Sequence, residues 1–359
     1  MKVLHVINSL LTGGAEKLIA DSIPIYQQKK IATDVLLLKK STTNFYSKLE
    51  KESNGKLFSL SNGSVYSPLL IFKIIPFLKK YDLIHVHLFP CLYWVVIAKI
   101  ISFSKVKIVY TEHSTNNRRR QNKFFKIVDK LIYKHFESII CITDGVKENL
   151  IQHIGTNYPI SVINNGILLK DFNANNSDIL QNNSKKDFTL IQVSSFRGAK
   201  DQTTLIKSLT YISEEIKLIL VGTGDKIDYC KNLVNELQLQ NRVTFLGNRY
   251  DIPDLLAASD VVILSSNHEG FGLSIVEGMA AKKPCVATDV EGIREIVSGF
   301  GLLFEKGNSQ QLSEIILELY KNQDYYNKIA NQCFVRAQDF DIEKMVDSYI
   351  EIYKKIKTK

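Results

Sequence analysis

The stretch "DVVILSSNHEGFGLSIVEGMAA", from Asp260 to Ala281, is the most informative segment of this chain for its architecture. It opens with a continuous apolar run, which predicts a strand of a parallel sheet that is buried on both faces. A loop with two glycines follows, and from Leu273 onward the apolar residues recur at helical spacing. The stretch therefore predicts a strand, a turn and a helix at the carboxyl edge of a parallel sheet, where open α/β sheets bind their ligands.

The same alternation of short apolar runs and longer amphipathic stretches fills the rest of the chain. The runs that predict parallel strands are "KVLHVIN", "TDVLLL", "LIHVHL", "KIVYTEH" and "SIICIT" in the first half, and "FTLIQVSS", "KLILVG", "RVTFLG", "DVVILSS" and "PCVATD" in the second. Helical patterns such as "GAEKLIADSIPIYQQKK" and "PLLIFKIIPFLKKY" lie between them. Two successive series of this kind predict an α/β protein with two doubly wound, Rossmann-like domains.

A polar stretch separates the two series. Residues 164–187 are rich in Asn, Ser and Lys and lack periodicity, which predicts a linker and an edge segment. The chain of 359 residues also exceeds the roughly 250–300 residues at which single cores stop growing. We therefore expect a first domain at 1–168 and a second at 169–341, followed by a C-terminal helix at 342–359 with a lysine-rich end that suits the helix dipole.

The cysteines and the apolar segments indicate the compartment. Five cysteines are scattered along the chain without a C-x-x-C pair, which favours buried thiols in a reducing compartment over a disulfide framework or a zinc site. The apolar start is broken by His5 and Asn8, so it does not fit a signal peptide. The run from Cys91 to Phe103 is interrupted by Lys99 and is shorter than the about 20 residues that a membrane span needs. We expect a cytoplasmic protein.

The positive charge lies entirely in the first half. Residues 1–168 hold 23 basic and 11 acidic side chains, an excess of 12, whereas the whole chain has a net charge of +9. The remainder is therefore slightly acidic. Such asymmetry favours a negatively charged partner for the first half: a membrane, a nucleic acid or a phosphorylated substrate.

Two carboxylates, Glu269 and Glu277, flank the turn in the segment from Asp260 to Ala281. Gly270 and Gly272 allow the backbone to approach a ligand closely, and the helix that follows offers free amides to a phosphate. A carboxylate beside a phosphate is unfavourable unless it contacts something neutral, so Glu269 and Glu277 favour a sugar phosphate over bare phosphate. A structural alternative stays open: Ser274 and Glu277 match the S-x-x-E capping box, and Glu269 could be a solvated loop carboxylate.

Here the sequence resembles a known family. "HEGFGLSIVEGMAAKKPCVATDVEGIREIV" is similar to the signature of retaining glycosyltransferases of family 4, in which two glutamates stand eight positions apart around E-G-F-G. Seven further blocks resemble the family's blocks and occur in the same order: "LTGGAEKL", "HVHLF", "TEHS", "VINNGI", "RGAKDQTTLIKSL", "LVGTGD" and "VTFLGN". Eight blocks in order make the resemblance specific over nearly the whole chain.

The resemblance implies a fold and an activity. It implies the GT-B fold, in which two Rossmann-like domains face a central cleft and the last helix crosses back to the first domain. The implied reaction is the transfer of a sugar, with retention at the anomeric carbon, from a nucleotide-diphosphate sugar to an acceptor hydroxyl. The second domain would hold the donor, and the first would face a glycan or lipid-linked acceptor of cell-surface polysaccharide or lipopolysaccharide synthesis. No metal and no other cofactor is expected.

The resemblance also assigns roles in the second domain. Glu277 would accept hydrogen bonds from the donor ribose, and Glu269 would contact the transferred sugar near the reacting carbon. The turn would hold the diphosphate on its amides, and the loop after "VTFL" would lie near the base. The residues of these two segments are Gly270, Phe271, Gly272 and Leu273 for the turn, and Gly247, Asn248 and Arg249 for the loop.

One position departs from the family pattern. The family usually supplies an arginine and, five residues later, a lysine that together stabilise the departing diphosphate. Lys200 occupies the lysine position, but Ser195 stands at the arginine position. Arg197 is the candidate replacement, because its planar guanidinium suits phosphate oxygens. The alternative is that Arg197 is only a solvated loop residue.

In the first domain, Gly13 and Gly14 follow a strand and precede a helix, a weak signal by itself that is also compatible with a tight turn. By resemblance this loop closes over the donor phosphates, and His113, at the end of "KIVYTEH", contacts the transferred sugar rather than acting as a strong base. His85 and His87 alternate on one strand and so share a face, which makes a metal site conceivable. The sequence shows no third ligand, so structural histidines are the favoured interpretation.

A basic amphipathic segment follows His113. Residues 116–136, "NNRRRQNKFFKIVDKLIYKHF", combine three arginines and several lysines with apolar Phe124, Phe125, Ile127, Leu131 and Ile132. Such a segment can lie on anionic lipid, which predicts peripheral contact with the inner face of the cytoplasmic membrane. The alternative is a core-facing helix with a solvated basic face. Nucleic acid is the weaker partner, since no nucleic-acid motif accompanies the charge.

Three other classes of protein compete with the transferase. A non-hydrolysing nucleotide-sugar epimerase shares the two-domain shape, but the E-G-F-G block and the early G-G loop favour the transferase. A two-lobed sugar-binding protein does not fit the missing export signal and the cationic loop at Lys200. A nicotinamide dehydrogenase is disfavoured because "LTGGAE" is not G-x-G-x-x-G.

Overall fold

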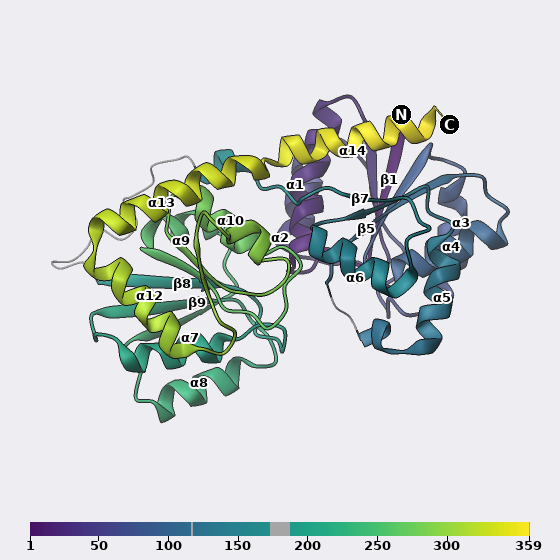
Figure 1. The fold of residues 1–359 in the computed structure, drawn as a ribbon. Helices are drawn as coiled ribbons and strands as arrows, with labels where there is room; N and C mark the ends of the chain where they lie inside the picture. The colour runs from purple at the N-terminus through teal and green to yellow at the C-terminus, as the bar shows by residue number, and fades with distance from the viewer. Residues whose placement is uncertain (116–117, 173–186, 359) are drawn as a thin grey trace. The chain divides into compact units, whose positions relative to one another are not determined.

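A computed structural model describes residues 1–115, 118–172 and 187–358 of the chain. Its contacts divide the chain into two compact units. The first unit consists of Met1–Gly166 together with Ile342–Lys359, and the second consists of Ile167–Asp341 (Figure 1). Most of the polar stretch that predicts a linker, residues 173–186, lies outside the described residues; its start contains a short 3-10 helix, η2 (Leu169–Phe172).

The first unit is built on a parallel sheet of seven strands in the order β3-β2-β1-β4-β5-β6-β7. The strands are β1 (Lys2–Ile7), β2 (Ala32–Leu37), β3 (Leu57–Ser59), β4 (Leu83–His87), β5 (Lys107–Glu112), β6 (Ser138–Cys141) and β7 (Ile160–Val162). The chain winds outward from β1 through β2 to β3, then returns to β4 on the other side of β1. The order therefore reverses between β1 and β4, which is the switch point where ligands of such sheets bind.

Seven α-helices and a 3-10 helix accompany this sheet among the described residues. They are α1 (Gly14–Gln28), α2 (Asn44–Glu52), α3 (Leu70–Leu78), α4 (Cys91–Ile101), η1 (Arg118–Gln121), α5 (Lys123–Tyr133), α6 (Asp144–Ile154) and α14 (Ile342–Lys357). The two predicted helices with internal prolines form in spite of them, with Pro24 inside α1 and Pro76 inside α3. Tertiary packing of their apolar faces outweighs the loss of one backbone hydrogen bond at each proline.

The second unit has a parallel sheet of six strands in the order β10-β9-β8-β11-β12-β13, with its switch point between β8 and β11. The strands are β8 (Phe188–Val193), β9 (Ile216–Val221), β10 (Val243–Gly247), β11 (Val261–Leu264), β12 (Cys285–Thr288) and β13 (Leu302–Phe304). The helices are α7 (Gln202–Ser208), α8 (Ile227–Glu236), α9 (Ile252–Ala258), α10 (Leu273–Ala280), α11 (Arg294–Val297), α12 (Ser309–Lys321) and α13 (Gln323–Ala337), with the 3-10 helices η3 (Leu209–Tyr211) and η4 (Gln338–Phe340).

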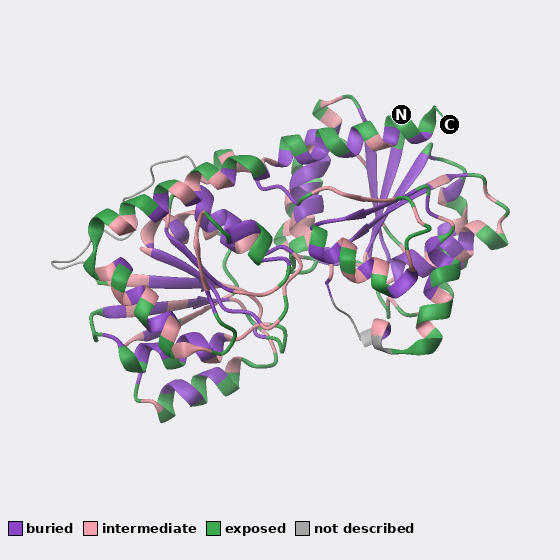
Figure 2. Cartoon of the chain, in the orientation of Figure 1, coloured by how far each residue is buried: buried purple, intermediate pink, exposed green. Residues whose placement is uncertain are grey.

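All ten predicted strands form, and the structure adds three that the sequence did not indicate. The added strands β3, β7 and β13 have three residues each and stand at sheet edges. An edge strand this short pairs on one side only, so it needs no continuous apolar run. Figure 2 shows that the strands of both sheets are largely buried, whereas the outer faces of the helices are exposed.

All five cysteines are free and buried, as predicted from their scatter. Among the described residues, no helix combines the length and the apolar content needed to cross a bilayer.

The last helix completes the first unit through buried tyrosines. The Tyr353 hydroxyl of α14 lies 2.5 Å from His85 Nδ1 on β4 and 3.4 Å from the Tyr26 hydroxyl on α1. One turn earlier, the Tyr349 hydroxyl lies 3.2 Å from Thr111 Oγ1 on β5. Because both tyrosines are fully buried, these hydroxyls supply polar partners inside a core that otherwise excludes water.

Candidate active site

The loops that leave β8 and β11 are joined to each other at the switch point of the second unit. The Asp201 amide donates to the Ser265 carbonyl at 3.1 Å, and the Asn267 amide donates to the Ala199 carbonyl at 2.8 Å. Lys200 and Ser266 form an antiparallel bridge between these two contacts. The backbone of the Arg197–Lys200 segment is therefore fixed directly against the loop that carries Glu269.

Two buried glutamines that the sequence analysis missed position these loops. Gln192, at the end of β8, accepts a hydrogen bond from the Ser265 amide at 3.1 Å and donates to Ser194 Oγ at 2.8 Å. Gln202 donates to Ser194 Oγ at 3.0 Å and to the Ser195 carbonyl at 3.1 Å. The available signal was a glutamine inside the apolar run "FTLIQVSS", since a buried amide is retained where it can satisfy its hydrogen bonds.

Lys200 and Glu269 form a direct ion pair. The ammonium of Lys200 contacts Glu269 Oε2, and the two side chains are 16% and 18% exposed. The other oxygen, Oε1, accepts a hydrogen bond from the Gly270 amide at 3.1 Å. The structure thus joins two of the predicted catalytic residues, and their partial burial strengthens the attraction between the opposite charges.

The helix α10 begins where the sequence predicts, but a glycine caps it. Gly272 occupies the N-cap with φ +82° and makes no side-chain capping bond. The capping-box alternative is wrong, because Ser274 lies within the first turn and not at the N-cap. Glu277 is 4% exposed.

The backbone amides at the start of α10 are not used in hydrogen bonds to the described chain. Among the residues that the structure describes, none accepts a hydrogen bond from the backbone amides of Phe271, Gly272, Leu273 or Ser274. The Phe271 ring does not compete for the space, since it is 2% exposed and packs edge-on against Phe340. The turn thus presents amide donors at the positive end of a helix dipole, beside the ammonium of Lys200.

Two glycines let other loops pack against these segments. Gly222 has φ +130°, and a Cβ there would lie 2.2 Å from the Ser194 carbonyl oxygen. Gly292 has φ +82°, and a Cβ there would lie 2.5 Å from the Glu269 carbonyl oxygen and 2.8 Å from that of Gly270. Neither position accepts a larger residue without moving the backbone of a predicted site loop.

Arg197 is exposed, and its side chain makes no ion pair or hydrogen bond with any described residue. Its amide donates to the Ser195 carbonyl at 3.1 Å, so the two positions are turned toward each other by a tight loop. The guanidinium is therefore available to a ligand, and this exposure fits a phosphate-binding arginine as well as a solvated loop residue.

The loop after β10 carries the three residues expected near the base. Gly247 has φ +65°, and its carbonyl accepts from the Gly222 amide at 2.7 Å. Asn248 Oδ1 accepts from the Thr223 hydroxyl at 3.1 Å. Arg249 is bound to the neighbouring Asp251 by two contacts, so its side chain is already engaged in this structure.

In the first unit, Gly13 and Gly14 begin α1. Gly13 is its N-cap in an extended conformation, and a Cβ there would lie 2.3 Å from Glu16 Oε2. The loop between β1 and α1 is attached to the loop after β4, because Asn8 Nδ2 donates to the Phe89 carbonyl at 2.8 Å. Gly13 and Gly14 therefore lie at the switch point of the first sheet.

His113 follows β5 and contacts a second histidine. Its Nε2 lies 3.1 Å from His87 Nδ1, and His87 Nε2 lies 3.2 Å from Nδ1 of His5 on β1. Burial lowers the pKa of His113 to about 4 and that of His5 to about 3, and it also lowers the pKa of His87. These rings are therefore neutral at pH 7.

The inference that His85 and His87 have no third histidine nearby was wrong. His5, His85 and His87 each bring a ring nitrogen within 4.8 Å of the others. However, both nitrogens of His85 already contact hydroxyl groups, Nδ1 that of Tyr353 at 2.5 Å and Nε2 that of Thr111 at 2.7 Å. The hydrogen-bonding pattern therefore supports structural histidines over a metal-binding set.

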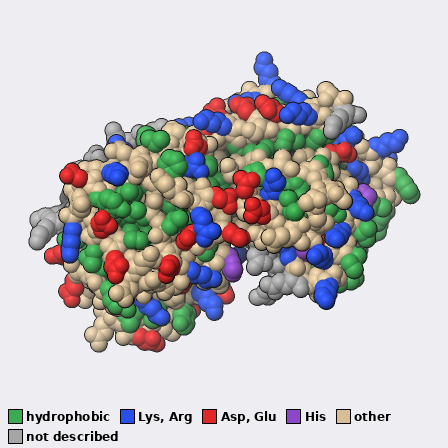
Figure 3. All heavy atoms as spheres, viewed as in Figure 1, with side chains coloured by type: hydrophobic (Ala, Val, Ile, Leu, Met, Phe, Trp, Pro, Cys, Tyr) green, Lys and Arg blue, Asp and Glu red, His purple; other side chains and the backbone are tan. Residues whose placement is uncertain are grey.

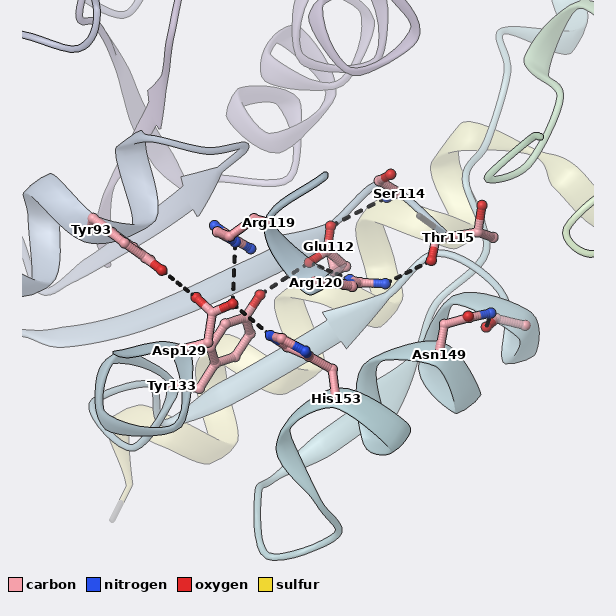
Figure 4. Close-up of polar contacts among 11 residues, drawn as sticks. Tyr93, Glu112, Ser114, Thr115, Arg119, Arg120, Asp129, Tyr133, Asn149 and His153 are labelled. Carbon is pink, nitrogen blue, oxygen red and sulfur yellow. Dashed lines mark hydrogen bonds and ion pairs between the residues drawn. The ribbon is translucent and has the colours of Figure 1, made fainter. Parts of the chain in front are cut away.

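A buried ionic cluster anchors the segment that follows His113 (Figure 4). Asp129 of α5 lies at its centre and contacts three groups from other elements. These are the Tyr93 hydroxyl at 2.5 Å, His153 Nε2 at 2.7 Å and Arg119 Nε at 3.2 Å. The cluster thereby joins α4, α5, α6 and η1 around one fully buried carboxylate.

A second buried carboxylate, Glu112 at the end of β5, binds the next arginine. Arg120 lies 2.9 Å from Glu112 and donates to the Thr115 carbonyl at 2.7 Å, while the Tyr133 hydroxyl donates to Glu112 at 3.0 Å. Burial by itself would raise the pKa of Glu112, but Arg120 and Arg119 hold it below its usual value. Two of the three arginines of the basic segment thus neutralise buried carboxylates and do not face a membrane. Residues 116 and 117 of that segment lie outside the described residues.

Taken together, the second unit offers one chemical environment. A lysine, an exposed arginine and a helix start suit the negative charge of a diphosphate, while two carboxylates suit neutral hydroxyl groups. The first unit offers a neutral histidine and a glycine loop at its own switch point.

Two family models match the chain. The model described as Glycosyltransferase Family 4 matches residues 12–170, and the model described as Glycosyl transferases group 1 matches residues 175–334. Between them they cover most of both units.

Individual proteins agree with these models. The chain is 33% identical to the N-acetyl-alpha-D-glucosaminyl L-malate synthase of Bacillus anthracis, in a match that spans 47% of this chain and 46% of that protein, about half the length of each. It is 26% identical to the N-acetylgalactosamine-N,N'-diacetylbacillosaminyl-diphospho-undecaprenol 4-alpha-N-acetylgalactosaminyltransferase of Campylobacter jejuni, over 94% of this chain and 95% of that protein.

Among solved structures, HepE of Anabaena, in complex with UDP and glucose, superimposes with a TM-score of 0.87. The two chains are 28% identical, and the match covers 99% of this chain and 100% of HepE. The predicted fold is therefore confirmed. The chain belongs to the family 4 glycosyltransferases and has their GT-B fold of two Rossmann-like domains.

Proposed function

We propose that this protein is a retaining glycosyltransferase that moves a sugar from a UDP-sugar to a hydroxyl group of a lipid-linked or polysaccharide acceptor in cell-surface glycan synthesis. The observation that carries the proposal is the Lys200–Glu269 ion pair beside the amides of Phe271, Gly272 and Leu273. This arrangement brings a cation from the loop after β8 together with a carboxylate and unbonded amides from the loop after β11. A nucleotide-diphosphate sugar needs these three kinds of group along its length.

When the donor binds, Lys200 and Glu269 would separate and contact different parts of the donor. The diphosphate attracts the ammonium of Lys200 and the guanidinium of Arg197, and it accepts hydrogen bonds from the helix amides. Glu269 then accepts hydrogen bonds from hydroxyls of the transferred sugar, and the buried Glu277 accepts from those of the ribose. In the unliganded protein, Lys200 and Glu269 thus neutralise each other. On donor binding, the diphosphate takes over the contact with Lys200 and the sugar hydroxyls take over the contact with Glu269.

In the proposed reaction the acceptor oxygen bonds to the anomeric carbon as the bond from that carbon to the β-phosphate oxygen breaks. The leaving diphosphate takes the proton of the acceptor hydroxyl on the same face, which yields the glycoside and UDP with retention. Lys200, Arg197 and the helix amides stabilise the negative charge that develops on the leaving group. The proposal includes no metal ion, so chelation with EDTA should leave the rate unchanged.

The relatives support the choice of substrates. HepE was solved with UDP and glucose, and the Campylobacter jejuni relative is named for transfer onto an undecaprenyl diphosphate-linked sugar. A screen of UDP-sugars, GDP-mannose and ADP-glucose for thermal stabilisation tests the donor class, because a ligand at about a hundred times its dissociation constant stabilises by about 2.7 kcal/mol. Stabilisation by a UDP-sugar and none by the other two nucleotides is the expected result.

The release of UDP distinguishes the competing enzymes. A transferase releases UDP from the stabilising donor in proportion to an added glycan or undecaprenyl-linked acceptor. An epimerase of the non-hydrolysing kind would change the donor sugar without any acceptor, and a sugar-binding protein would release nothing. Either of those two results would overturn the proposed function.

We also propose that α5 contacts anionic lipid at the inner face of the cytoplasmic membrane. Phe124, Ile127 and Leu131 are 67%, 64% and 57% exposed, although all three are large and apolar. Their spacing places them along one side of the helix. Phe125 is only partly exposed and Ile132 is buried, so these two predicted members of the apolar surface belong to the core side.

Lysines border this apolar stripe. Lys123, Lys126 and Lys130 are exposed on α5, and at helical spacing they fall beside the stripe. Figure 3 shows basic and hydrophobic side chains together at the lower right of the molecule, where Figure 1 places α5. At the end of α4, which packs against α5, Phe103 is 91% exposed. An exposed apolar stripe bordered by lysines fits an anionic lipid surface better than it fits solvent alone.

A further inference from the structure

Three histidine rings of the first unit form a continuous chain from the core to its edge. The chain runs from His5, 1% exposed, through His87, 3% exposed, to the partly exposed His113. The contacts are His5 Nδ1 to His87 Nε2 at 3.2 Å and His87 Nδ1 to His113 Nε2 at 3.1 Å. His87 is therefore bonded through both of its ring nitrogens, and the only nitrogen of His113 that is left for a ligand is Nδ1.

A neutral imidazole carries one proton, so it donates from one nitrogen and accepts at the other. In a chain of neutral rings the protons must therefore all be donated in the same direction. Donation from His5 outward leaves His113 with its proton on Nδ1. Donation inward leaves His113 with its proton on Nε2 and a bare lone pair on Nδ1. The inner rings thus determine whether His113 offers a ligand a donor or an acceptor.

The inner end of the chain decides the direction. His5 Nε2 is buried and has no hydrogen-bond partner among the described residues. Outward donation leaves a lone pair at this nitrogen, whereas inward donation would leave an N–H group there. Among buried backbone groups, orphaned N–H donors are rarer than under-satisfied acceptors, and we apply the same order of cost to the ring nitrogen. Outward donation therefore leaves His5 Nε2 as an unpaired acceptor, which costs less free energy than an unpaired donor.

We propose that His5 and His87 are positioning residues that hold His113 in the Nδ1–H tautomer, so that it presents a hydrogen-bond donor to a ligand oxygen. Free histidine prefers the opposite Nε2–H tautomer, so this state has to be imposed by the chain of rings. The role rests on the proposed function, since it specifies how His113 meets an oxygen of the donor or acceptor. It also excludes His113 as the base that removes the acceptor proton, because the lone pair of its Nε2 is directed at His87.

His85 supplies a matched control. Its ring lies 4.1 Å from that of His87, centroid to centroid, and it is equally buried. Its nitrogens contact Tyr353 and Thr111, however, so it is outside the chain. Replacing His85 disturbs the packing around His87 without removing either link to His113.

The test is the long-range proton–nitrogen correlation spectrum of the full-length, unliganded protein labelled with ¹⁵N-histidine, which distinguishes the two tautomers of each of the seven histidines. The spectrum of His113→Asn assigns the His113 signal. In the wild type we expect both His87 and His113 as Nδ1–H, with the Nδ1–H form of His113 in about tenfold excess. His87→Phe should return His113 to mostly Nε2–H, whereas His85→Phe should leave it unchanged.

Several results would overturn the proposal. One is a wild-type His113 in the Nε2–H form, which needs no variant and so survives any failure of a variant to fold. If His87→Phe and His85→Phe changed the His113 tautomer equally, packing around His87 and not the chain of hydrogen bonds would determine that tautomer. Displacement of the ring signals of His5, His85 and His87 by one equivalent of zinc would show that these rings hold a metal. The spectrum needs no substrate, so the expected tautomers in a protein that transfers no sugar would refute only the proposed function.

Discussion

The ammonium of Lys200 and the carboxylate of Glu269 bind each other at the switch point of the second sheet, between the loops that leave β8 and β11. The two residues are 69 positions apart in sequence, and the parallel order of β8 and β11 places them side by side. When a ligand binds here, the contact between the two side chains can be replaced by separate contacts of each side chain with the ligand.

Replacing Glu269 should remove most of the activity. Glu269→Gln keeps the shape of the side chain but loses the charge that compensates Lys200, and we expect turnover to fall about a hundredfold to a thousandfold. Steady-state release of UDP measures the effect, with Glu236→Gln on the exposed end of α8 as the control. Normal turnover of Glu269→Gln would refute the assignment of this glutamate.

Moving the arginine back to its family position tests the role of Arg197. Arg197→Ala should weaken donor binding and lower kcat/KM about tenfold to a hundredfold, as expected for the loss of a charged hydrogen bond to phosphate. The double variant Ser195→Arg, Arg197→Ala should recover part of that loss. Lys231→Ala, an exposed cation on α8, is the control. An Arg197→Ala enzyme with unchanged kcat/KM would mean that the guanidinium is only solvated.

Alanine substitutions at Gly292 and Gly299, which share one backbone conformation, distinguish backbone strain from steric conflict. Gly292 and Gly299 have φ values of +82° and +81°, but only Gly292 is crowded, by the carbonyls of Glu269 and Gly270. Alanine should cost about 1–2 kcal/mol at both positions through the left-handed conformation. At Gly292 the steric conflict should add about 1–3 kcal/mol. Urea unfolding measures both variants, and equal losses of stability would contradict the packing described here.

Gly292→Ala should also lower activity, because the backbone that it displaces carries Glu269. Gly299→Ala should retain it. The comparison of kcat between the two variants is meaningful at a temperature where both are folded.

The buried histidines should make stability depend on pH. The pKa of His5 is lowered to about 3 and that of His113 to about 4, against about 6.5 in the unfolded chain. The unfolded state therefore binds more protons below pH 6.5, so stability is full above that pH and is lost as the pH falls toward 4. Each such ring lowers the free energy of unfolding by about 1.4 kcal/mol per pH unit within that window.

Urea unfolding between pH 7.5 and pH 5 measures this slope. His5→Phe should reduce it by the contribution of one ring, whereas His268→Gln, at an exposed histidine, should leave it unchanged. A slope that does not change in His5→Phe would show that this ring is not held neutral in the folded protein.

The exposed stripe on α5 should govern binding to lipid. The triple variant Phe124→Ser, Ile127→Ser, Leu131→Ser should bind phosphatidylglycerol vesicles at least about tenfold more weakly, because each apolar side chain contributes about 1.5–3 kcal/mol when fully buried. High salt should weaken binding of the wild type as the lysines are screened. Tyr211→Ser with Tyr229→Ser, two exposed aromatic residues of the second unit, is the control. Wild-type protein that does not sediment with these vesicles would remove the membrane proposal.

The sequence predicted the strands of both sheets and the turn at Gly272, because continuous apolar runs and glycines reflect local requirements. It did not predict β3, β7 and β13, since three-residue edge strands depend on a neighbouring strand for their pairing. It placed Lys200 and Glu269 in one site only through resemblance to a family. No periodicity connects two loops that meet through the order of the strands.

Other features of the site were beyond sequence reasoning for the same reason. The chain from His5 to His113 joins three strands that are far apart in sequence, and His5 had appeared only as an interruption of an apolar run. Arg119 and Arg120 looked like surface charge, because nothing in the sequence shows that Asp129 and Glu112 are buried beside them.

The position of α14 bears on the order in which the protein takes shape during synthesis. His85 is bonded to Tyr353, which lies 268 positions later, so the core of the first unit lacks that contact until residue 353 has left the ribosome. The second unit is continuous from Ile167 to Asp341 and can close its sheet before then. Synthesis of the first unit therefore begins before that of the second but is completed after it.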